Sequence, residues 1–342
     1  MSDNLKTTLF IVLAVYAVMG VGAVCGRAGW LNPKTRKDLL AVVINVLIPC
    51  MIIKNVLMNP VFKDPKNLYG PPLIGFSIIL VSVILGWIIA KVLPTSLTTL
   101  DTTKKIGTFA ACLGMLNYGY VPIPLIENLF PNNGGVLGVL FVQNVGTEFA
   151  LWTVCVFSFL GRFDSKTVKS LFNIPVMVIV GCLLINIFEP FESLPLKWRY
   201  AFKMYDLDIL FWTPINMLSS SAIPLSLLCV GGAIAEQFHL SDFVEDIGKT
   251  FRVSFVSTFF RLLVFPCLIL LAAKYLPCSR EAKIVTVIYA SMSSATFPIV
   301  LAETYDGDVK TALLTSLSNS LVAIATTPFW IVTGLKWVGV QQ

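Results

Sequence analysis

The sequence predicts an all-α polytopic membrane protein with ten transmembrane helices in a 5+5 inverted repeat. Of 342 residues, 56% are hydrophobic and only 13% are charged, whereas soluble proteins carry about 25% charged residues. Apolar runs of about 20 residues, the length that an α-helix needs to cross a bilayer, recur along the whole chain. The composition excludes an ordinary soluble enzyme or nucleic-acid-binding protein. An outer-membrane barrel would show alternating strands instead of continuous runs.

The apolar runs define the predicted spans and the segments between them. The spans lie at about 7–26, 39–58, 71–93, 105–130, 135–160, 171–190, 213–235, 250–276, 284–303 and 311–334. The first run is long for a signal peptide and lacks a clear cleavage site, so we expect a retained helix. The stretch 191–212 mixes basic and aromatic residues, which favours an interfacial helix. A further span there remains an alternative.

Like residues recur at nearly one offset, which indicates an internal repeat. Pro49 and Pro224 are 175 residues apart, as are Asn144 and Asn319, and Pro122 and Pro298 are 176 apart. Each pair falls at a similar place in its span, so the halves 1–160 and 161–342 correspond. An odd number of spans per half places the second half upside down relative to the first. Inverted repeats of this kind are typical of secondary transporters.

The distribution of Lys and Arg predicts the orientation. In the first half these residues gather in the loops after the first, third and fifth spans. Positive loops face the cytoplasm, so this half places the N-terminus outside. The second half favours the opposite orientation, but early helices usually dominate. We therefore expect a plasma (inner) membrane protein with both termini on the non-cytoplasmic side.

The fourth and ninth spans carry helix-breaking residues in their middle. Gly119, Pro122 and Pro124 interrupt an apolar run, and the segment 291–299 is rich in small hydroxyl residues and contains Pro298. Proline lacks a backbone donor and clashes with the preceding turn. Paired breaks in matching helices point to a transport site near the midplane, where half-helix N-termini suit an anion. A simple packing kink is the alternative.

Polar side chains inside other spans are further candidates. They are Gln143, Asn144, Glu148, Arg261, Ser316, Ser318, Asn319 and Ser320. Such residues usually face the bundle interior or a water-filled cavity. Asn144 and Glu148 are four residues apart and share a helix face. Two interpretations of Glu148 stay open: an ion pair with Arg261, or a titratable carboxylate that couples a proton to transport.

Signatures of catalysis are missing from the sequence. It has no HExxH, GxSxG or Walker motif and no cluster with metal-ligand spacing. We therefore expect no enzyme, no metal, no cofactor beyond a coupled proton, and no nucleic-acid partner.

Together these motifs resemble the auxin efflux carrier family, which includes the plant PIN-formed carriers and bacterial relatives. The segment 117–125 is similar to the family's fourth-helix crossover, with an added second proline, and 296–305 is similar to the ninth-helix crossover. Arg261 with Pro266 resembles the Arg and Pro of the eighth helix. Gln143 stands where plant carriers often have a glutamine.

The resemblance implies the bile-acid-symporter type of fold, with helices four and nine broken and crossing. Helices one, two, six and seven (about 7–58 and 171–235) would form a dimerising scaffold. Helices three to five and eight to ten (about 71–160 and 250–334) would form a transport domain that moves as an elevator. The short 161–170 loop favours a compact bacterial-type member. Small carboxylates such as malate or malonate are then expected, with uniport or proton coupling rather than sodium coupling.

The expected substrate site lies where the fourth and ninth helices cross. Its residues are Asn117, Tyr118, Gly119, Tyr120, Pro122, Ser293, Ser294, Ala295, Thr296 and Pro298. Support or coupling is expected from Gln143, Asn144, Glu148, Arg261, Ser318 and Asn319. The alternative function is a membrane ligand sensor that uses a transporter fold without net flux.

Overall fold

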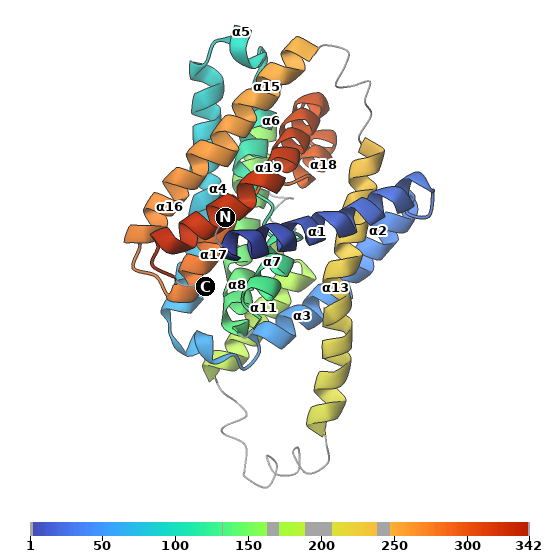
Figure 1. Cartoon of the computed structure of the whole chain (residues 1–342), viewed down its shortest axis with the longest axis vertical. Coiled ribbons are helices and arrows are strands. Elements are labelled where there is room, and N and C mark those ends of the chain that lie inside the picture. Colours follow the sequence, from blue (N-terminus) through green and yellow to red (C-terminus); the bar gives the residue numbers. More distant parts are fainter. Residues whose placement is uncertain (1–2, 132, 163–170, 189–206, 238–246, 341–342) are drawn as a thin grey trace.

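The chain folds into an assembly of helices. The computed structural model describes residues 3–131, 133–162, 171–188, 207–237 and 247–340 (Figure 1). Every regular element in these ranges is a helix. Seven helical segments are long and apolar enough to cross a membrane: Leu5–Arg27, Pro33–Val56, Lys66–Val92, Gly134–Leu160, Ile209–Glu236, Phe251–Tyr275 and Val309–Trp337. The protein is therefore an integral, multi-pass membrane protein.

The helices follow one another with short connections. In the first part of the chain they are α1 (Asp3–Arg27), α2 (Pro33–Val42), η1 (Val43–Leu47), α3 (Ile48–Val56), η2 (Pro60–Lys63), α4 (Lys66–Val92), α5 (Thr95–Thr98), α6 (Thr103–Gly114), α7 (Pro122–Leu129), α8 (Gly134–Ala150), η3 (Leu151–Cys155) and α9 (Val156–Leu160). The remainder comprises α11 (Ile174–Phe188), α13 (Leu207–Gln237), α15 (Ile247–Phe259), η5 (Phe260–Val264), α16 (Phe265–Tyr275), α17 (Arg280–Ser291), α18 (Phe297–Thr304) and α19 (Val309–Trp337).

Every predicted span coincides with helical structure, although not every span is one helix. The predicted spans 105–130 and 284–303 are each divided into two short helices, α6 with α7 and α17 with α18. The span 171–190 corresponds to α11, which at 15 residues is shorter than the seven long segments. The 5+5 inverted repeat stays a prediction. Residues 189–206, most of the stretch expected to form an interfacial helix, lie outside the described residues, and α13 begins at Leu207.

One group of helices forms around α13. It packs against α1 and α3, and α11 packs against α3 (Figure 1). The approach is close, since a Cβ atom at Gly22 would lie 2.2 Å from the carbonyl oxygen of Leu228. Likewise, a Cβ atom at Gly231 would lie 1.9 Å from the carbonyl oxygen of Met19. Small residues that let two backbones touch are typical of helix packing in membranes.

A second group forms around α4 and α8, which pack against each other, with α6 packed on α4. Contact here is also backbone to backbone, because a Cβ atom at Gly146 would lie 1.8 Å from the carbonyl oxygen of Pro72. On the other side α19 packs against α15, α17 and α6. The indole Nε1 of Trp330 in α19 donates to the carbonyl oxygen of Leu262 in η5 at 2.7 Å.

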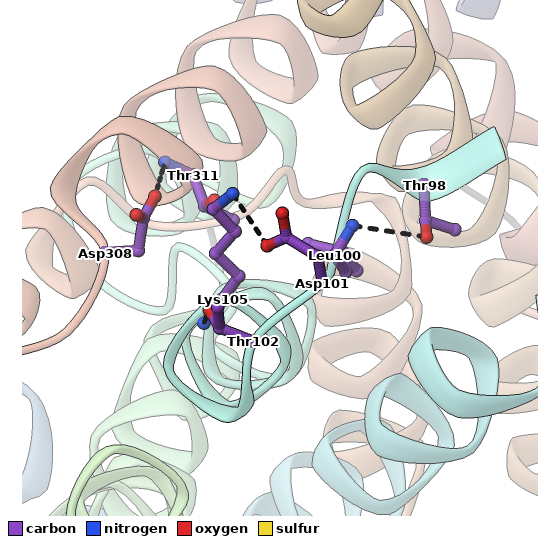
Figure 2. A network of polar contacts seen from close by, with 7 residues as sticks. All are labelled: Thr98, Leu100, Asp101, Thr102, Lys105, Asp308 and Thr311. Carbon is purple, nitrogen blue, oxygen red and sulfur yellow. Dashed lines mark hydrogen bonds and ion pairs between the residues drawn. The ribbon is translucent and has the colours of Figure 1, made fainter. Parts of the chain in front are cut away.

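Polar caps fix the ends of α6 and α19 (Figure 2). At the start of α6, the Thr102 hydroxyl accepts a hydrogen bond from the backbone N–H of Lys105 at 3.3 Å. At the start of α19, Asp308 accepts from the N–H of Thr311 at 2.7 Å. The Lys105 ammonium also pairs with Asp101 at 2.8 Å. Caps of this kind satisfy N–H groups that have no partner within the helix, so both helices start at defined residues.

Candidate functional site

The first interrupted segment, residues 115–121, separates α6 from α7 and is called the first break below. Met115 follows α6 in an extended conformation (φ −83°, ψ 99°), and α7 begins at Pro122. Pro122 and Pro124 cannot donate to the preceding turn, so a continuous helix is unavailable here. The predicted interruption near Gly119–Pro122 is confirmed, and it starts four residues earlier than Gly119.

The second interrupted segment, residues 292–296, separates α17 from α18 and is called the second break. Met292 follows α17 in an extended conformation (φ −80°, ψ 144°), as Met115 follows α6. Pro298 is the second residue of α18. The interruption expected within 291–299 is therefore also present.

The two breaks lie side by side and satisfy each other's backbone. Leu116 and Ser294 form an antiparallel bridge. The N–H of Asn117 donates to the carbonyl oxygen of Ser293 at 2.9 Å, and the N–H of Ala295 donates to that of Met115 at 2.8 Å. Backbone groups without a helical partner must be satisfied within a membrane protein, and here they pair across the two breaks.

Arg261 holds the helix ends that enter the two breaks. Its side chain is fully buried in η5. The guanidinium donates to the carbonyl oxygen of Met292 through Nε at 3.1 Å and Nη2 at 3.0 Å, and to that of Leu113 through Nη1 at 3.3 Å. Both carbonyls belong to helix C-termini, where a positive charge is favourable. The expected ion pair between Arg261 and Glu148 is therefore wrong, because Arg261 spends its donors on backbone carbonyls.

A cavity of about 530 Å³ opens beside the breaks, within the range of small-molecule sites. Nine of the predicted site and support residues line it: Asn117, Tyr118, Gly119, Tyr120, Asn144, Glu148, Ser293, Ala295 and Thr296. The opposite wall comes from α1, α3, α11 and α13 and is mainly apolar. It includes Met19, Ile48, Ile52, Ile179, Ala222, Ile223 and Val230. The cavity therefore lies between the α13 group and the two breaks.

Glu148 and Asn144 supply much of the polar chemistry on the α8 side. Glu148 accepts hydrogen bonds from the Tyr118 hydroxyl at 2.7 Å and from the Trp152 indole Nε1 at 3.0 Å. The amide oxygen of Asn144 accepts from the hydroxyl of Tyr289 in α17. Among the described residues, the side chain of Asn117 has no hydrogen-bond partner, although its backbone is bonded. It is therefore available to a bound solute.

The start of α7 does not form the anion site expected of a half-helix N-terminus. Two of its first four residues, Pro122 and Pro124, have no N–H. The N–H groups of the other two, Ile123 and Leu125, are bonded to carbonyl oxygens four residues earlier at 3.1 and 3.3 Å. No free backbone donor remains in these four residues, so recognition of an anion falls to side chains of the cavity.

Comparison with known proteins places this geometry in a family. The chain matches the family model described as membrane transport protein over residues 8–175 and 178–331. It belongs to the auxin efflux carrier family. An uncharacterized transporter of Methanocaldococcus jannaschii is 22% identical over 323 residues, which cover 92% of this chain and 96% of that protein. The resemblance seen in 117–125 and 296–305 is thereby confirmed, and the family points to membrane transport rather than catalysis.

Several residues expected at the site of this auxin efflux carrier family member lie behind the cavity wall. Pro122 and Pro298 are in the first turns of α7 and α18. Ser294 is buried, and its hydroxyl accepts from the Asn319 amide nitrogen at 2.8 Å. The Ser318 hydroxyl bonds within α19. These residues shape or support the breaks; they do not face a solute.

Gln143 is also absent from the cavity lining. It is fully buried, and both polar atoms of its side chain lack a hydrogen-bond partner among the described residues. It lies against α4, where a Cβ atom at Gly75 would be 3.1 Å from Cγ of Gln143. The expected supporting role of Gln143 at the breaks is not visible in its contacts.

The sequence interpretation missed Trp152 and the wall contributed by the α13 group. Trp152 lines the cavity and holds Glu148, and its ring packs edge-on against Phe297 with centroids 6.0 Å apart. Tyr16 of α1 lines the opposite wall, and its hydroxyl donates to the Ser320 carbonyl at 3.3 Å. The spacing of Trp152, four residues after Glu148, could have identified it as a neighbour on the same helix face.

Proposed function

We propose that this protein is a secondary transporter of small organic anions, with carboxylates as the substrate class, and that the cavity beside the two breaks is the substrate site. The observation that carries the proposal is the composition of the cavity. Two helix interruptions, paired through Leu116 and Ser294, provide its polar wall, and apolar side chains provide the other. Broken helices that meet near the middle of a membrane protein are a common construction of transport sites.

Within this site, side chains recognise the polar end of the solute. The amide of Asn117 and the hydroxyl of Thr296 line the cavity and supply hydrogen-bond donors. The apolar wall with Ile48, Ile52 and Ile223 receives the organic body. A few placed polar groups in a mostly apolar cavity are typical of small-molecule recognition.

We propose that transport proceeds by alternating access of the elevator type. The scaffold would be α1, α2, α3, α11 and α13, and the moving domain would contain α4 to α9 and α15 to α19. The cavity supports this division, because its two walls come from the two groups. In an elevator the solute lies at such a boundary and travels with one group. Cross-links that fix α3 to α8 should abolish flux and leave solute binding intact; flux through the cross-linked protein would contradict the elevator.

The scaffold is also the proposed surface for a homodimer and for lipid. Large apolar side chains are exposed on α11 and α13, including Met177, Val180, Leu184, Leu210 and Met217. Exposed apolar patches of this size mark protein or membrane contact. Mass measurement of the purified protein in detergent tests the dimer, and a monomer at all concentrations would reject it.

The plasma-membrane location and the outward position of both termini remain a proposal from the Lys and Arg pattern. Reporter fusions at residues 1 and 342 test it. Activity of a cytoplasm-specific reporter at either end would overturn the orientation.

Counterflow of labelled carboxylates in proteoliposomes tests the proposed function. The panel is indole-3-acetate, malate and malonate, with tryptamine as a cationic analogue of the first. Saturable flux of a carboxylate supports the proposal. Flux of tryptamine alone would contradict the substrate class. A carboxylate that raises the unfolding temperature without any flux would make the protein a sensor.

A further inference from the structure

The cavity contains one carboxylate and no basic side chain. Glu148 is the acidic residue of the lining, and no Lys, Arg or His lines the cavity in the described part of the chain. Arg261, the buried cation nearest in role, is bonded to the carbonyls of Leu113 and Met292. An anionic solute therefore enters a site whose fixed charge has its own sign.

The partners of Glu148 are neutral. The Tyr118 hydroxyl donates to Oε1 at 2.7 Å, and the Trp152 indole donates to Oε2 at 3.0 Å. Tyr118 belongs to the first break. Trp152 packs on Phe297, the first residue of α18, directly after the second break. The carboxylate is thus oriented by groups attached to both breaks, but no described partner cancels its charge.

The titratable groups that surround Glu148 are mostly phenols. Tyr118, Tyr120 and Tyr289 face it from the first break and from α17. The other helices packed on α8 carry titratable or charged groups that do not line the cavity: Lys66, Tyr69 and Lys91 in α4, Cys50 and Lys54 in α3, Lys63 in η2, Glu127 in α7, and Cys182 in α11. None of these groups compensates Glu148 across the cavity.

Two carboxylates cannot both remain ionised in one enclosed site, because their repulsion is weakly screened there. A proton shared between them removes the repulsion and creates a strong hydrogen bond between a carboxyl and a carboxylate. Glu148 has the position for this role, since it lines the cavity together with Asn117 and Thr296.

We propose that Glu148 is the proton site of this transporter, and that a carboxylate solute is carried together with one proton bound to Glu148. This inference rests on the proposed function. On loading, the Glu148 carboxylate takes a proton from water on that side, and the resulting O–H donates to the solute carboxylate. On release, the O–H bond breaks and the proton leaves to water on the other side. A monocarboxylate and one proton together carry no net charge.

The test compares wild type with Glu148→Gln in proteoliposomes, using indole-3-acetate as the probe and subtracting flux into protein-free liposomes. In wild type, a gradient of one pH unit should drive about tenfold accumulation on the alkaline side, and a potassium diffusion potential should have no effect. Glutamine imitates the protonated carboxyl but carries no proton. Glu148→Gln should therefore keep flux, lose the response to the pH gradient, and become sensitive to potential, with about tenfold accumulation for 60 mV.

Two results would overturn the inference while leaving the proposed function intact. One is carboxylate flux with the same pH and potential responses in wild type and Glu148→Gln. The other is wild-type flux that follows the membrane potential without proton movement, recorded with a pH dye trapped in the liposomes. The second measurement needs only wild type, so it decides even where Glu148→Gln fails to fold. Failure of every carboxylate to move in wild type would instead reject the proposed function.

Discussion

Arg261 grips the carbonyl oxygen of Met292 with two nitrogens of its guanidinium, at 3.0 and 3.1 Å. The same side chain reaches the carbonyl oxygen of Leu113 at 3.3 Å. One buried cation thus joins the C-terminal ends of α17 and α6, directly before the two breaks. Its position explains how two interrupted helices stay aligned: a fixed positive charge satisfies the carbonyls that the interruptions leave unpaired.

Replacing Arg261 by Met should destabilise the protein and abolish flux. The substitution leaves two buried carbonyl groups without a donor, each costing about 1–3 kcal/mol. Thermal unfolding in detergent should show a clear drop, with Arg261→Lys between Met and wild type because an ammonium keeps the charge but cannot form the same fork.

The control for Arg261 is Arg252→Met. Arg252 is exposed and bonds one carbonyl, that of Ser96, at 2.6 Å. Surface substitutions of this kind usually change stability by less than about 0.5 kcal/mol. An Arg261→Met protein that unfolds at the wild-type temperature would show that the guanidinium does not hold the breaks.

Asn319→Ala should reduce flux more than it reduces stability. The lost hydrogen bond to Ser294 has a net value of about 1 kcal/mol, but Ser294 is the residue that bridges the two breaks. A double-mutant cycle with Ser294→Ala measures the coupling, expected at about 0.5–1.5 kcal/mol. Thr326→Ala, whose exposed hydroxyl bonds within α19, serves as the control. Additive effects of the two substitutions would mean that their bond does not position the second break.

Gly22→Ala should lower stability through the contact between α1 and α13. The new Cβ would meet the Leu228 carbonyl at 2.2 Å, and overpacking of this kind costs about 1–3 kcal/mol. Gly20 lies two residues earlier on α1 with nothing within 4 Å of a Cβ, so Gly20→Ala is the matched control. The unfolding temperature should fall for Gly22→Ala only. Equal temperatures for the two variants would contradict the close approach.

Prolines made the breaks predictable from sequence. Pro122, Pro124 and Pro298 remove donors that a helix needs, whatever surrounds them, so local chemistry was sufficient there. The beginning of each break was less predictable. Met115 and Met292 have no intrinsic reason to leave a helix. They become extended because the two breaks pair with each other, a contact between residues far apart in the chain.

The partners of the buried polar residues could not be predicted in the same way. Arg261 and Glu148 were the obvious pair by charge, but backbone carbonyls compete for a guanidinium as well as a carboxylate does. Ser294 was expected to face a solute, and instead it turns toward Asn319 because a bridging residue projects to one side only. Helical spacing places side chains on a face, whereas which neighbour that face meets depends on tertiary packing.

The measurement that most directly tests the central claim is carboxylate counterflow in Asn117→Ala, with Asn128→Ala as the matched control. Asn117 lines the cavity in the first break, whereas Asn128 is exposed on α7 and bonds the Pro124 carbonyl of its own helix. Both variants should unfold at the wild-type temperature. The account predicts that Asn117→Ala loses saturable flux while Asn128→Ala keeps it. Normal transport by folded Asn117→Ala would contradict a substrate site at the paired breaks.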